Sequence, residues 1–321
     1  MEELPLVSIL MPCYNSEKYI SEAISSIINQ SYSNWELLIC NDSSTDNSLS
    51  IIKEFESDKI KIFENKKNKG YLKTCNFLFD QAKGDYITFQ DSDDYSSINR
   101  IELLLKEFKK NPKLGACGTQ FNFMTDSGIK LPKDSPIYPL KHNDIIDSFI
   151  TAPGFCGASV MVTKEVIDSI GVYNEYWDRI GAEDFYWLYL ISEIFEVSNI
   201  PNTSYFYRHN PNSITRNKTN PRKIHCHDFL TFLIEQRIKT SSDFLEESNI
   251  NGIREMENKF TQPYIDEPNL LFFRLADWAY TDNKNKEVFQ QLFKALKNRP
   301  TSLYTYKTIW FYFKKVYFKS L

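Results

Sequence analysis

The sequence predicts an α/β fold in which helices flank a mostly parallel sheet. Short apolar runs alternate with amphipathic segments at regular spacing, a pattern typical of β-α-β units. Polar clusters follow three of the apolar runs, at residues 12–15, 41–46 and 91–94. Ligands of such sheets bind beyond the carboxyl ends of the strands. We therefore expect the three clusters to converge at one functional edge.

Each element follows from its local pattern. Residues 6–12 are apolar and end in a proline, as in a buried parallel strand. Residues 16–30 carry apolar side chains at helical spacing, with Ser16 as the expected N-cap. The alternation continues with strands at 35–42, 59–65 and 85–94, and with helices at 48–57, 67–84 and 96–112.

The rest of the chain divides at about residue 220. Strands are expected at 115–124, within 154–171 and within 198–217, with a helix starting near Ala182. From Pro221 the periodicity is helical throughout. We therefore expect a catalytic α/β domain at 1–220 and a C-terminal helical extension at 221–321.

Composition excludes several classes of protein. The 321 residues carry a net charge of −4, so nucleic acid is not an expected partner. Six scattered cysteines without a CxxC pair suggest buried thiols in a reducing compartment. Residues 1–5 lack the pattern of a secretory signal, and no apolar window is long enough to span a membrane. We expect a cytoplasmic protein, with the inner face of the plasma membrane as an alternative location.

The densest polar cluster is QDSDD, residues 90–94. Two carboxylates at i and i+2 just past a strand end, here Asp91 and Asp93, can reach one cation. Hard oxygen ligands suit Mg²⁺ or Mn²⁺, which then shares its open positions with substrate phosphates. A solvated turn explains an isolated Asp-x-Asp equally well, but this one ends a strand opposite two other polar clusters.

Five segments occur in the order typical of family 2 glycosyltransferases, and the chain resembles that family over residues 5–216. They are VSILMPCYNSEKYISEAISSIINQSY, ELLICNDSSTDNS, KNKGYLKTCN, GDYITFQDSDD and IGAEDFYWLYL. Residues 157–187 also resemble the acceptor-side segment of galactosyltransferases and chondroitin-polymerase-like enzymes. The resemblance implies the GT-A fold, a UDP-sugar donor and a saccharide acceptor.

The resemblance also implies the nucleotide-binding residues. Asp42 would accept a hydrogen bond from the uracil ring, because a carboxylate only accepts hydrogen bonds. The family's usual arginine before Asn76 is replaced by Cys75, and Lys73 is the alternative cation. Asp91 would touch the ribose or the metal. The nucleotide-binding set is Pro12, Tyr14, Asn15, Asp42, Asn68, Gly70, Asp91, Ser92 and Asp93. Asp94 is expected to be structural.

In the family, the aspartate of the Glu-Asp pair is the catalytic base, which here is Asp184. It would take a proton from the acceptor hydroxyl as that oxygen attacks the anomeric carbon with inversion. Glu183 and Asp184 also suit a helix N-terminus through the helix dipole, which is the structural alternative. We expect Glu183, Trp177 and Arg208 to contact the acceptor or the donor sugar.

A late polar loop supplies the last expected metal ligand. His209 would bind the metal together with Asp91 and Asp93, and Ser213 would support it. His225-Cys226-His227 has no further ligand pair at metal-site spacing, so zinc is not expected there.

The last segment, 301–321, mixes aromatic and basic side chains. It predicts either an interfacial membrane anchor, which would suit a lipid-linked acceptor, or a helix docked on the protein.

We therefore expect an inverting, Mn²⁺- or Mg²⁺-dependent hexosyltransferase that acts in surface-polysaccharide synthesis, such as that of capsule, O-antigen or lipooligosaccharide. The non-enzymatic alternative is a degenerate carbohydrate-binding or scaffolding protein on the same fold. Degeneration should first remove Asp93 or Asp184, and both are present. A dinucleotide-binding enzyme would need a G-x-G-x-x-G segment where Pro12-Cys13-Tyr14-Asn15 stands.

Overall fold

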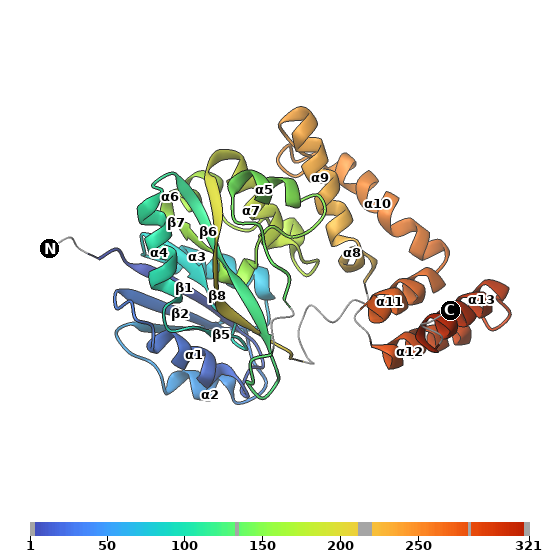
Figure 1. Cartoon of the computed structure of the whole chain (residues 1–321), viewed down its shortest axis with the longest axis horizontal. Coiled ribbons are helices and arrows are strands. Elements are labelled where there is room, and N and C mark those ends of the chain that lie inside the picture. Colours follow the sequence, from blue (N-terminus) through green and yellow to red (C-terminus); the bar gives the residue numbers. More distant parts are fainter. Residues whose placement is uncertain (1–3, 132–134, 211–219, 282–283, 318–321) are drawn as a thin grey trace. The chain divides into compact units, whose positions relative to one another are not determined.

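The computed structural model describes residues 4–131, 135–210, 220–281 and 284–317. These residues form two compact units, and each is described by itself (Figure 1). The first unit comprises the described residues up to 210 together with Ile234–Lys239. The second comprises the described residues of 217–233 and 240–321.

The first unit is built on an eight-stranded sheet with the strand order β3-β2-β1-β4-β7-β6-β8-β5. Strands β3, β2, β1 and β4 are mutually parallel, and β8 runs parallel to β6. Strand β7 is antiparallel to both of its neighbours, and β5 is antiparallel to β8. The strands are β1 (Val7–Cys13), β2 (Trp35–Asn41), β3 (Ile60–Glu64), β4 (Tyr86–Phe89), β5 (Tyr95–Ser96), β6 (Leu114–Met124), β7 (Met161–Thr163) and β8 (Glu196–Arg208).

Helices flank this sheet, as the sequence predicts. The predicted helices are all present, and α5 is an additional one that the sequence analysis did not predict. Two short 3₁₀ turns, Gly157–Ser159 and Glu175–Trp177, precede β7 and α7. The helices are α1 (Ile20–Ile28), α2 (Ser48–Lys53), α3 (Tyr71–Gln81), α4 (Arg100–Lys110), α5 (His142–Ser148), α6 (Lys164–Ile170) and α7 (Glu183–Ile194).

The core lies on both faces of the parallel strands. In β1, Val7, Ile9 and Met11 belong to the same buried cluster as the apolar sides of α1 and α4. Leu10 points to the opposite face because strand side chains alternate, and it is also fully buried. A strand buried on both faces must be apolar at almost every position, which explains the continuous run at residues 6–12.

Strand register brings the polar strand ends together. Cys13 pairs with Asn41 at the ends of β1 and β2, and Leu10 of β1 pairs with Phe89 at the end of β4. The loops that follow these strands therefore leave the sheet at the same edge, as predicted.

The second unit is helical. It contains α8 (Pro221–Ile224), the beginning of α9 (Cys226–Thr240), α10 (Ile250–Asp266), α11 (Asn269–Thr281), α12 (Asn285–Asn298) and α13 (Leu303–Tyr317). A small apolar cluster that includes Ala276, Val288, Leu292 and Tyr312 joins α11, α12 and α13. Among the described residues, no helix has both the length and the apolar character needed to cross a bilayer.

Candidate active site

The loops after β1 and β2 are joined by hydrogen bonds through Asn15. Its backbone N–H donates to Ser44 Oγ at 3.0 Å, and its side-chain oxygen accepts from the Thr45 N–H at 2.8 Å. Asn15 has a φ of 51°, a left-handed conformation that asparagine adopts more readily than most residues. Tyr14 next to it is 43% exposed, so its ring is accessible for stacking on a base. Pro12 lies within β1.

Asp42 organises the loop that precedes α3. Its Oδ1 accepts from Asn65 Nδ2 and from the Lys69 N–H, and its Oδ2 accepts from the Gly70 N–H, each at 2.8 Å. A carboxylate offers about four acceptor positions, so these bonds leave room for one further donor. The predicted contact with uracil is therefore compatible with this loop-holding role, which the sequence analysis did not predict.

The same loop contacts the segment before α7. Asn68 Oδ1 accepts from Arg179 Nη2 at 3.0 Å. Gly70 has a φ of +92°, and a Cβ there would lie 3.2 Å from Asp178 Oδ1. Lys73, the alternative cation for the nucleotide, instead pairs with Asp178 at 3.4 Å. Donor-side and acceptor-side segments therefore meet at Gly70.

Each residue of the aspartate cluster after β4, residues 91–94, has a hydrogen-bond partner outside the cluster. Ser92 is buried, and its hydroxyl lies 2.7 Å from Ser16 Oγ. Half-buried Asp91 accepts from the Tyr71 hydroxyl at 3.3 Å. Asp93 accepts from Asn210 Nδ2 at 2.9 Å. Asp94 is buried and accepts the Arg208 N–H at 2.8 Å, so it is structural, as predicted.

Glu183 and Asp184 form the first turn of α7. Ala182 before them has a φ of 72°, which turns the chain sharply into the helix. Asp184 Oδ1 accepts the Phe185 N–H at 2.9 Å, so the carboxylate also serves the helix N-terminus. A Cβ on Gly157 would lie 1.9 Å from Asp184 Oδ2. The Asp184 carboxylate therefore occupies space that exists only because residue 157 is glycine.

The carboxylates of these two segments interact electrostatically. Burial raises the pKa of Asp91 to about 7, and the charges of Asp93 and Asp184 add to this effect. Burial and the neighbouring Asp184 raise the pKa of Glu183 to about 8, and burial raises the pKa of Asp184 to about 6. The positive charge of the Arg100 guanidinium lowers the pKa of Asp91 and so offsets part of this rise. Asp91 therefore interacts both with Asp93 of its own loop and with Glu183 and Asp184 of α7, and we call these four carboxylates the acidic site.

This donor set fits a hard divalent cation. Asp91 and Asp93 supply carboxylate oxygens, the ligand type that Mg²⁺ and Mn²⁺ prefer, and a cation would offset their mutual repulsion. Over the described ranges, no three His, Cys, Asp or Glu side chains are grouped to hold a metal ion by themselves. Two carboxylates completed by water and substrate phosphate are the usual arrangement for Mg²⁺.

The His209 ring stacks on Phe123 with a centroid separation of 4.8 Å. Its neighbour Asn210 donates to Asp93 at 2.9 Å. Because the described residues contain no group of three His, Cys, Asp or Glu side chains placed to hold a metal ion, a role for His209 as a ligand stays a prediction. Ser213, its expected support, lies outside the described residues.

Two further residues predicted to contact a sugar have buried side chains in this structure. The Trp177 side chain is fully buried, so neither face of its indole is open to a sugar. Arg208 is 2% exposed and bonds to protein groups: its Nε donates to Asp93 O at 2.6 Å, its Nη1 to Asp126 O at 3.1 Å, and its Nη2 pairs with Glu22. Arg208 therefore fixes the aspartate loop rather than contacting a substrate.

Several site residues were missed by the sequence analysis. Arg100 is fully buried, donates to Phe89 O at 2.9 Å and faces the ring of Tyr205, whose hydroxyl accepts the Asp91 N–H at 3.2 Å. Tyr71 directly follows Gly70 in the segment KNKGYLKTCN. Its place in that segment was the one sequence feature that could have indicated a role in the site. Gly157 and Arg100 carry no local pattern that distinguishes them.

Comparisons with known proteins identify the family and the fold of the chain. The model of the family "Glycosyl transferase family 2" matches residues 8–171, which is about half of the chain. That range contains both aspartates of the Asp-x-Asp segment and Gly157, whereas Asp184 lies just beyond it.

Among curated relatives, the putative glycosyltransferase EpsE of Bacillus subtilis is 34% identical over 178 residues, 54% of this chain and 62% of its own length. The UDP-Glc:alpha-D-GlcNAc-diphosphoundecaprenol beta-1,3-glucosyltransferase WfgD of Escherichia coli is 43% identical over 106 residues, 33% of this chain and 42% of its own. Chondroitin synthase of Pasteurella multocida is 41% identical over 118 residues, 36% of this chain and 12% of its own. Each match spans less than two thirds of the relative.

Solved structures with the same fold include Staphylococcus aureus TarS in complex with UDP-GlcNAc, with a TM-score of 0.58 and 18% identity over 88% of this chain and 83% of that chain. The mannosyltransferase PcManGT of Pyrobaculum calidifontis, in complex with GDP-Man and Mn²⁺, has a TM-score of 0.58 and 16% identity over 93% of this chain and 89% of that chain. At these identities the likeness shows the fold, which is the predicted GT-A arrangement with additional C-terminal helices.

Proposed function

The chain belongs to glycosyl transferase family 2, and from that premise we propose an inverting, metal-dependent transfer of a hexose or N-acetylhexosamine from a UDP-sugar to a saccharide acceptor. The observation that carries the proposal is the acidic site, in which Asp91 lies within electrostatic reach of Asp93, Glu183 and Asp184. The reaction needs carboxylates that hold a metal ion at the donor diphosphate. It also needs a carboxylate nearby that accepts the proton of the acceptor hydroxyl.

The donor nucleotide would bind at the joined loops after β1 and β2. The exposed ring of Tyr14 offers a face to the base, and Asp42 keeps one acceptor position for a uracil N–H. Asn15, Asn68, Gly70 and Ser92 would shape the pocket through the hydrogen bonds described above. The choice of UDP over GDP rests on Asp42.

Asp91 and Asp93 would hold Mn²⁺ or Mg²⁺. When bound, the ion would supply positive charge that stabilises the leaving diphosphate. The side chains around these carboxylates would keep them aimed at the diphosphate. Tyr71 donates to Asp91, and Asn210 donates to Asp93.

Asp184 would be the general base. Its carboxylate would accept the proton of the acceptor hydroxyl while that oxygen forms the bond to the anomeric carbon. The bond from the anomeric carbon to the diphosphate breaks on the opposite side, and the nucleoside diphosphate leaves with the electron pair. Glu183 would orient a hydroxyl of the acceptor or of the donor sugar.

We further propose a role in surface-polysaccharide synthesis. An acceptor carried on a lipid would bring the enzyme to the inner face of the plasma membrane. The exposed aromatic and basic residues of α13 would suit that location. Tyr304, Tyr306 and Trp310 are each at least 50% exposed, while Lys314 and Lys315 lie next to aromatic rings.

The first test is calorimetry of the purified chain with UDP, GDP and dTDP, each with and without Mn²⁺. We expect UDP to bind, and Mn²⁺ to tighten its binding. Asp93→Ala should lose the Mn²⁺-dependent part, whereas Asp80→Ala, a substitution on the exposed side of α3, should keep it. Folded protein that binds no nucleotide would contradict the enzyme assignment and favour a degenerate carbohydrate-binding or scaffolding protein.

A further inference from the structure

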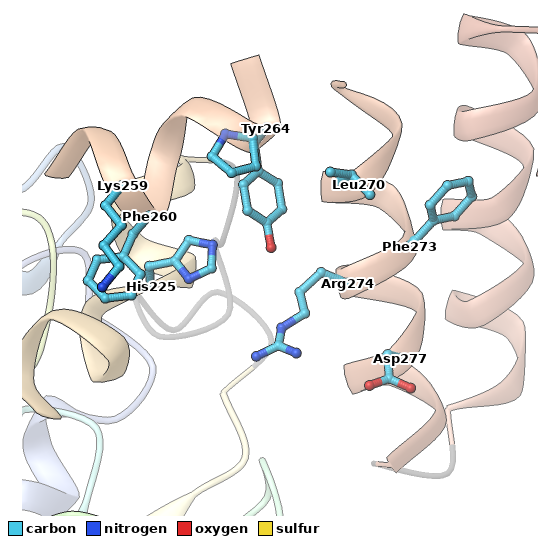
Figure 2. A pocket seen from close by; sticks show the side chains of 9 residues that line it. His225, Lys259, Phe260, Tyr264, Leu270, Phe273, Arg274 and Asp277 are labelled. Carbon is cyan, nitrogen blue, oxygen red and sulfur yellow. The ribbon is translucent and has the colours of Figure 1, made fainter. Parts of the chain in front are cut away.

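The helical unit contains a cavity of about 460 Å³ between α10 and α11, with α8–α9 at one end (Figure 2). Aromatic side chains form much of its lining, including Phe260 and Tyr264 of α10 and Phe273 of α11. All of its lining residues belong to the second unit, so the cavity is distinct from the acidic site. Nothing in the transfer reaction uses it.

His225 forms the buried side of this cavity. It is 8% exposed, and its ring lies against Tyr264 with a centroid separation of 4.8 Å and stacks on Phe260 at 6.1 Å. Its Nδ1 pairs with Asp228. Its Nε2 is buried and has no hydrogen-bond partner among the described residues. A buried polar atom without a hydrogen-bond partner is unfavourable, so this nitrogen is suited to bind a ligand.

Cationic side chains border the same space. Arg274 and Lys259 line the cavity and are exposed. Figure 2 shows Tyr264 and Arg274 projecting from their two helices into the space beside His225. The two nearby carboxylates are already engaged, since Asp277 accepts the Tyr312 hydroxyl at 2.8 Å and Asp228 pairs with His225. The lining carries two basic side chains and one carboxylate, that of Asp277, so basic groups outnumber acidic ones there.

We propose that this cavity binds a saccharide unit that carries an anionic group, either a carboxylate or a phosphate. The aromatic rings offer apolar faces to the sugar ring, and His225 Nε2 bonds to one of its polar groups. Arg274 binds the anion through its guanidinium, which presents paired donors to a carboxylate or a phosphate. The inference rests on the proposed function, because the bound saccharide would be part of the acceptor.

The test is ligand-observed NMR and calorimetry on the full chain with glucuronic acid, glucose 1-phosphate, glucose and inorganic phosphate. We expect glucuronic acid or glucose 1-phosphate to bind at least tenfold more tightly than glucose and than inorganic phosphate. A preference for the first identifies a carboxylate as the anion, and a preference for the second identifies a phosphate.

Variants locate the site. Arg274→Gln should weaken binding of the anionic saccharide at least tenfold, and Tyr264→Ala should weaken all saccharides. The matched control is Arg254→Gln, because Arg254 is exposed on the same unit and does not line the cavity. Equal binding of glucose and the anionic sugars, equal binding of inorganic phosphate and glucose 1-phosphate, or unchanged binding by Arg274→Gln would each overturn the proposal.

The same preparation separates this inference from the proposed transferase activity. UDP binding without saccharide binding would contradict the cavity proposal alone. Saccharide binding without UDP binding would contradict the transferase proposal and leave the cavity as a binding site.

Discussion

At the residue scale, Asp184 and Glu183 are adjacent in sequence but differ in surroundings. Asp184 is held against Gly157 and bonded to its own helix, whereas the pKa of Glu183 is raised further by the charge of Asp184. The residue with the lower pKa is ionised first as the pH rises. Asp184 is therefore the better general base of the two at neutral pH.

This difference predicts the pH dependence of transfer. Asp184 must be ionised to accept a proton, so kcat/KM should rise as the pH increases through about 6 and then level off. Asp184→Asn should lower kcat by at least roughly 100-fold while UDP binding persists, because general-base catalysis contributes about 10²–10⁴-fold. Glu183→Gln is the matched comparison and should lower kcat less than Asp184→Asn, because glutamine can still hydrogen-bond a sugar hydroxyl. If Glu183→Gln lowered kcat more than Asp184→Asn did, Glu183 rather than Asp184 would be the general base.

Gly157 gives a second prediction at this scale. Gly157→Ala would place a methyl group 1.9 Å from the present position of Asp184 Oδ2, so the carboxylate must move. We expect transfer to fall at least tenfold while UDP affinity stays within about twofold, because catalytic groups tolerate displacements of much less than 1 Å.

The control for Gly157→Ala is Gly171→Ala, where an added Cβ meets no atom within 4 Å but the φ of +81° is strained. That variant should lose about 1 kcal/mol of stability and keep its activity. Equal activity losses in the two variants, measured beside their melting curves, would show that Gly157 acts through stability only.

At the scale of elements, the end of β8 controls the aspartate loop. Arg208 is the last residue of the strand, and its backbone and guanidinium reach Asp94, Asp93 and Asp126. The guanidinium also pairs with Glu22 of α1. A strand that pairs with β6 and β5 thus fixes a loop more than a hundred residues earlier in the chain.

Removing this guanidinium should therefore destabilise the first unit. We expect Arg208→Met to lower the free energy of unfolding in urea by about 3 kcal/mol, because the carbonyls of Asp93 and Asp126 and the carboxylate of Glu22 lose the donors of a buried guanidinium. Glu22→Gln keeps an acceptor oxygen at a partly exposed position and should cost about 1 kcal/mol or less. A loss below 1 kcal/mol in Arg208→Met would contradict the structural role assigned to Arg208.

Element boundaries show where local patterns were insufficient. Ser16 was predicted to cap the first helix, but α1 begins at Ile20 without a side-chain cap. The Ser16 hydroxyl instead bonds to Ser92 in the aspartate loop, and its backbone carbonyl accepts the Tyr19 and Ile20 N–H groups. A partner 76 residues away cannot be identified from a four-residue capping pattern.

At the scale of the whole molecule, the helical extension both packs internally and presents an exposed surface. Tyr312 and Thr305 of α13 are buried, which agrees with a docked helix. Its remaining aromatic side chains are exposed, as an interfacial anchor requires; they are Tyr304, Tyr306, Trp310, Phe311, Phe313 and Tyr317. The buried face of α13 agrees with the docked-helix interpretation, and its exposed face is the part on which the membrane-anchor interpretation can be tested.

The exposed face predicts binding to anionic membranes. Phosphatidylglycerol-containing vesicles should sediment the protein, and phosphatidylcholine vesicles should not. Lys314→Glu/Lys315→Glu should weaken vesicle binding at least tenfold, since each basic residue near an anionic surface contributes about 1 kcal/mol. Lys294→Glu/Lys297→Glu on α12 changes the same charge elsewhere and should have a smaller effect. Equal losses in both variants would indicate non-specific attraction rather than a surface on α13.

The sequence by itself determined the order of the β-α units and the sheet edge at which the polar strand ends meet. Both depend on local periodicity and on the polar residues that end each strand, such as Asp91 and Asp93 after β4. It also made Asp42 and Asp184 the candidates for uracil binding and for the general base, because they stand in segments that resemble the family.

Only the tertiary structure decided which polar and aromatic side chains remain accessible. Trp177 and Arg208 were predicted to contact sugars and are buried, whereas Tyr71, Arg100 and Gly157 support the carboxylates without any local signal. The physical reason is that burial and hydrogen-bond partners depend on contacts between segments far apart in the chain. Residue type and spacing determine what a side chain can do, and packing determines which groups it reaches.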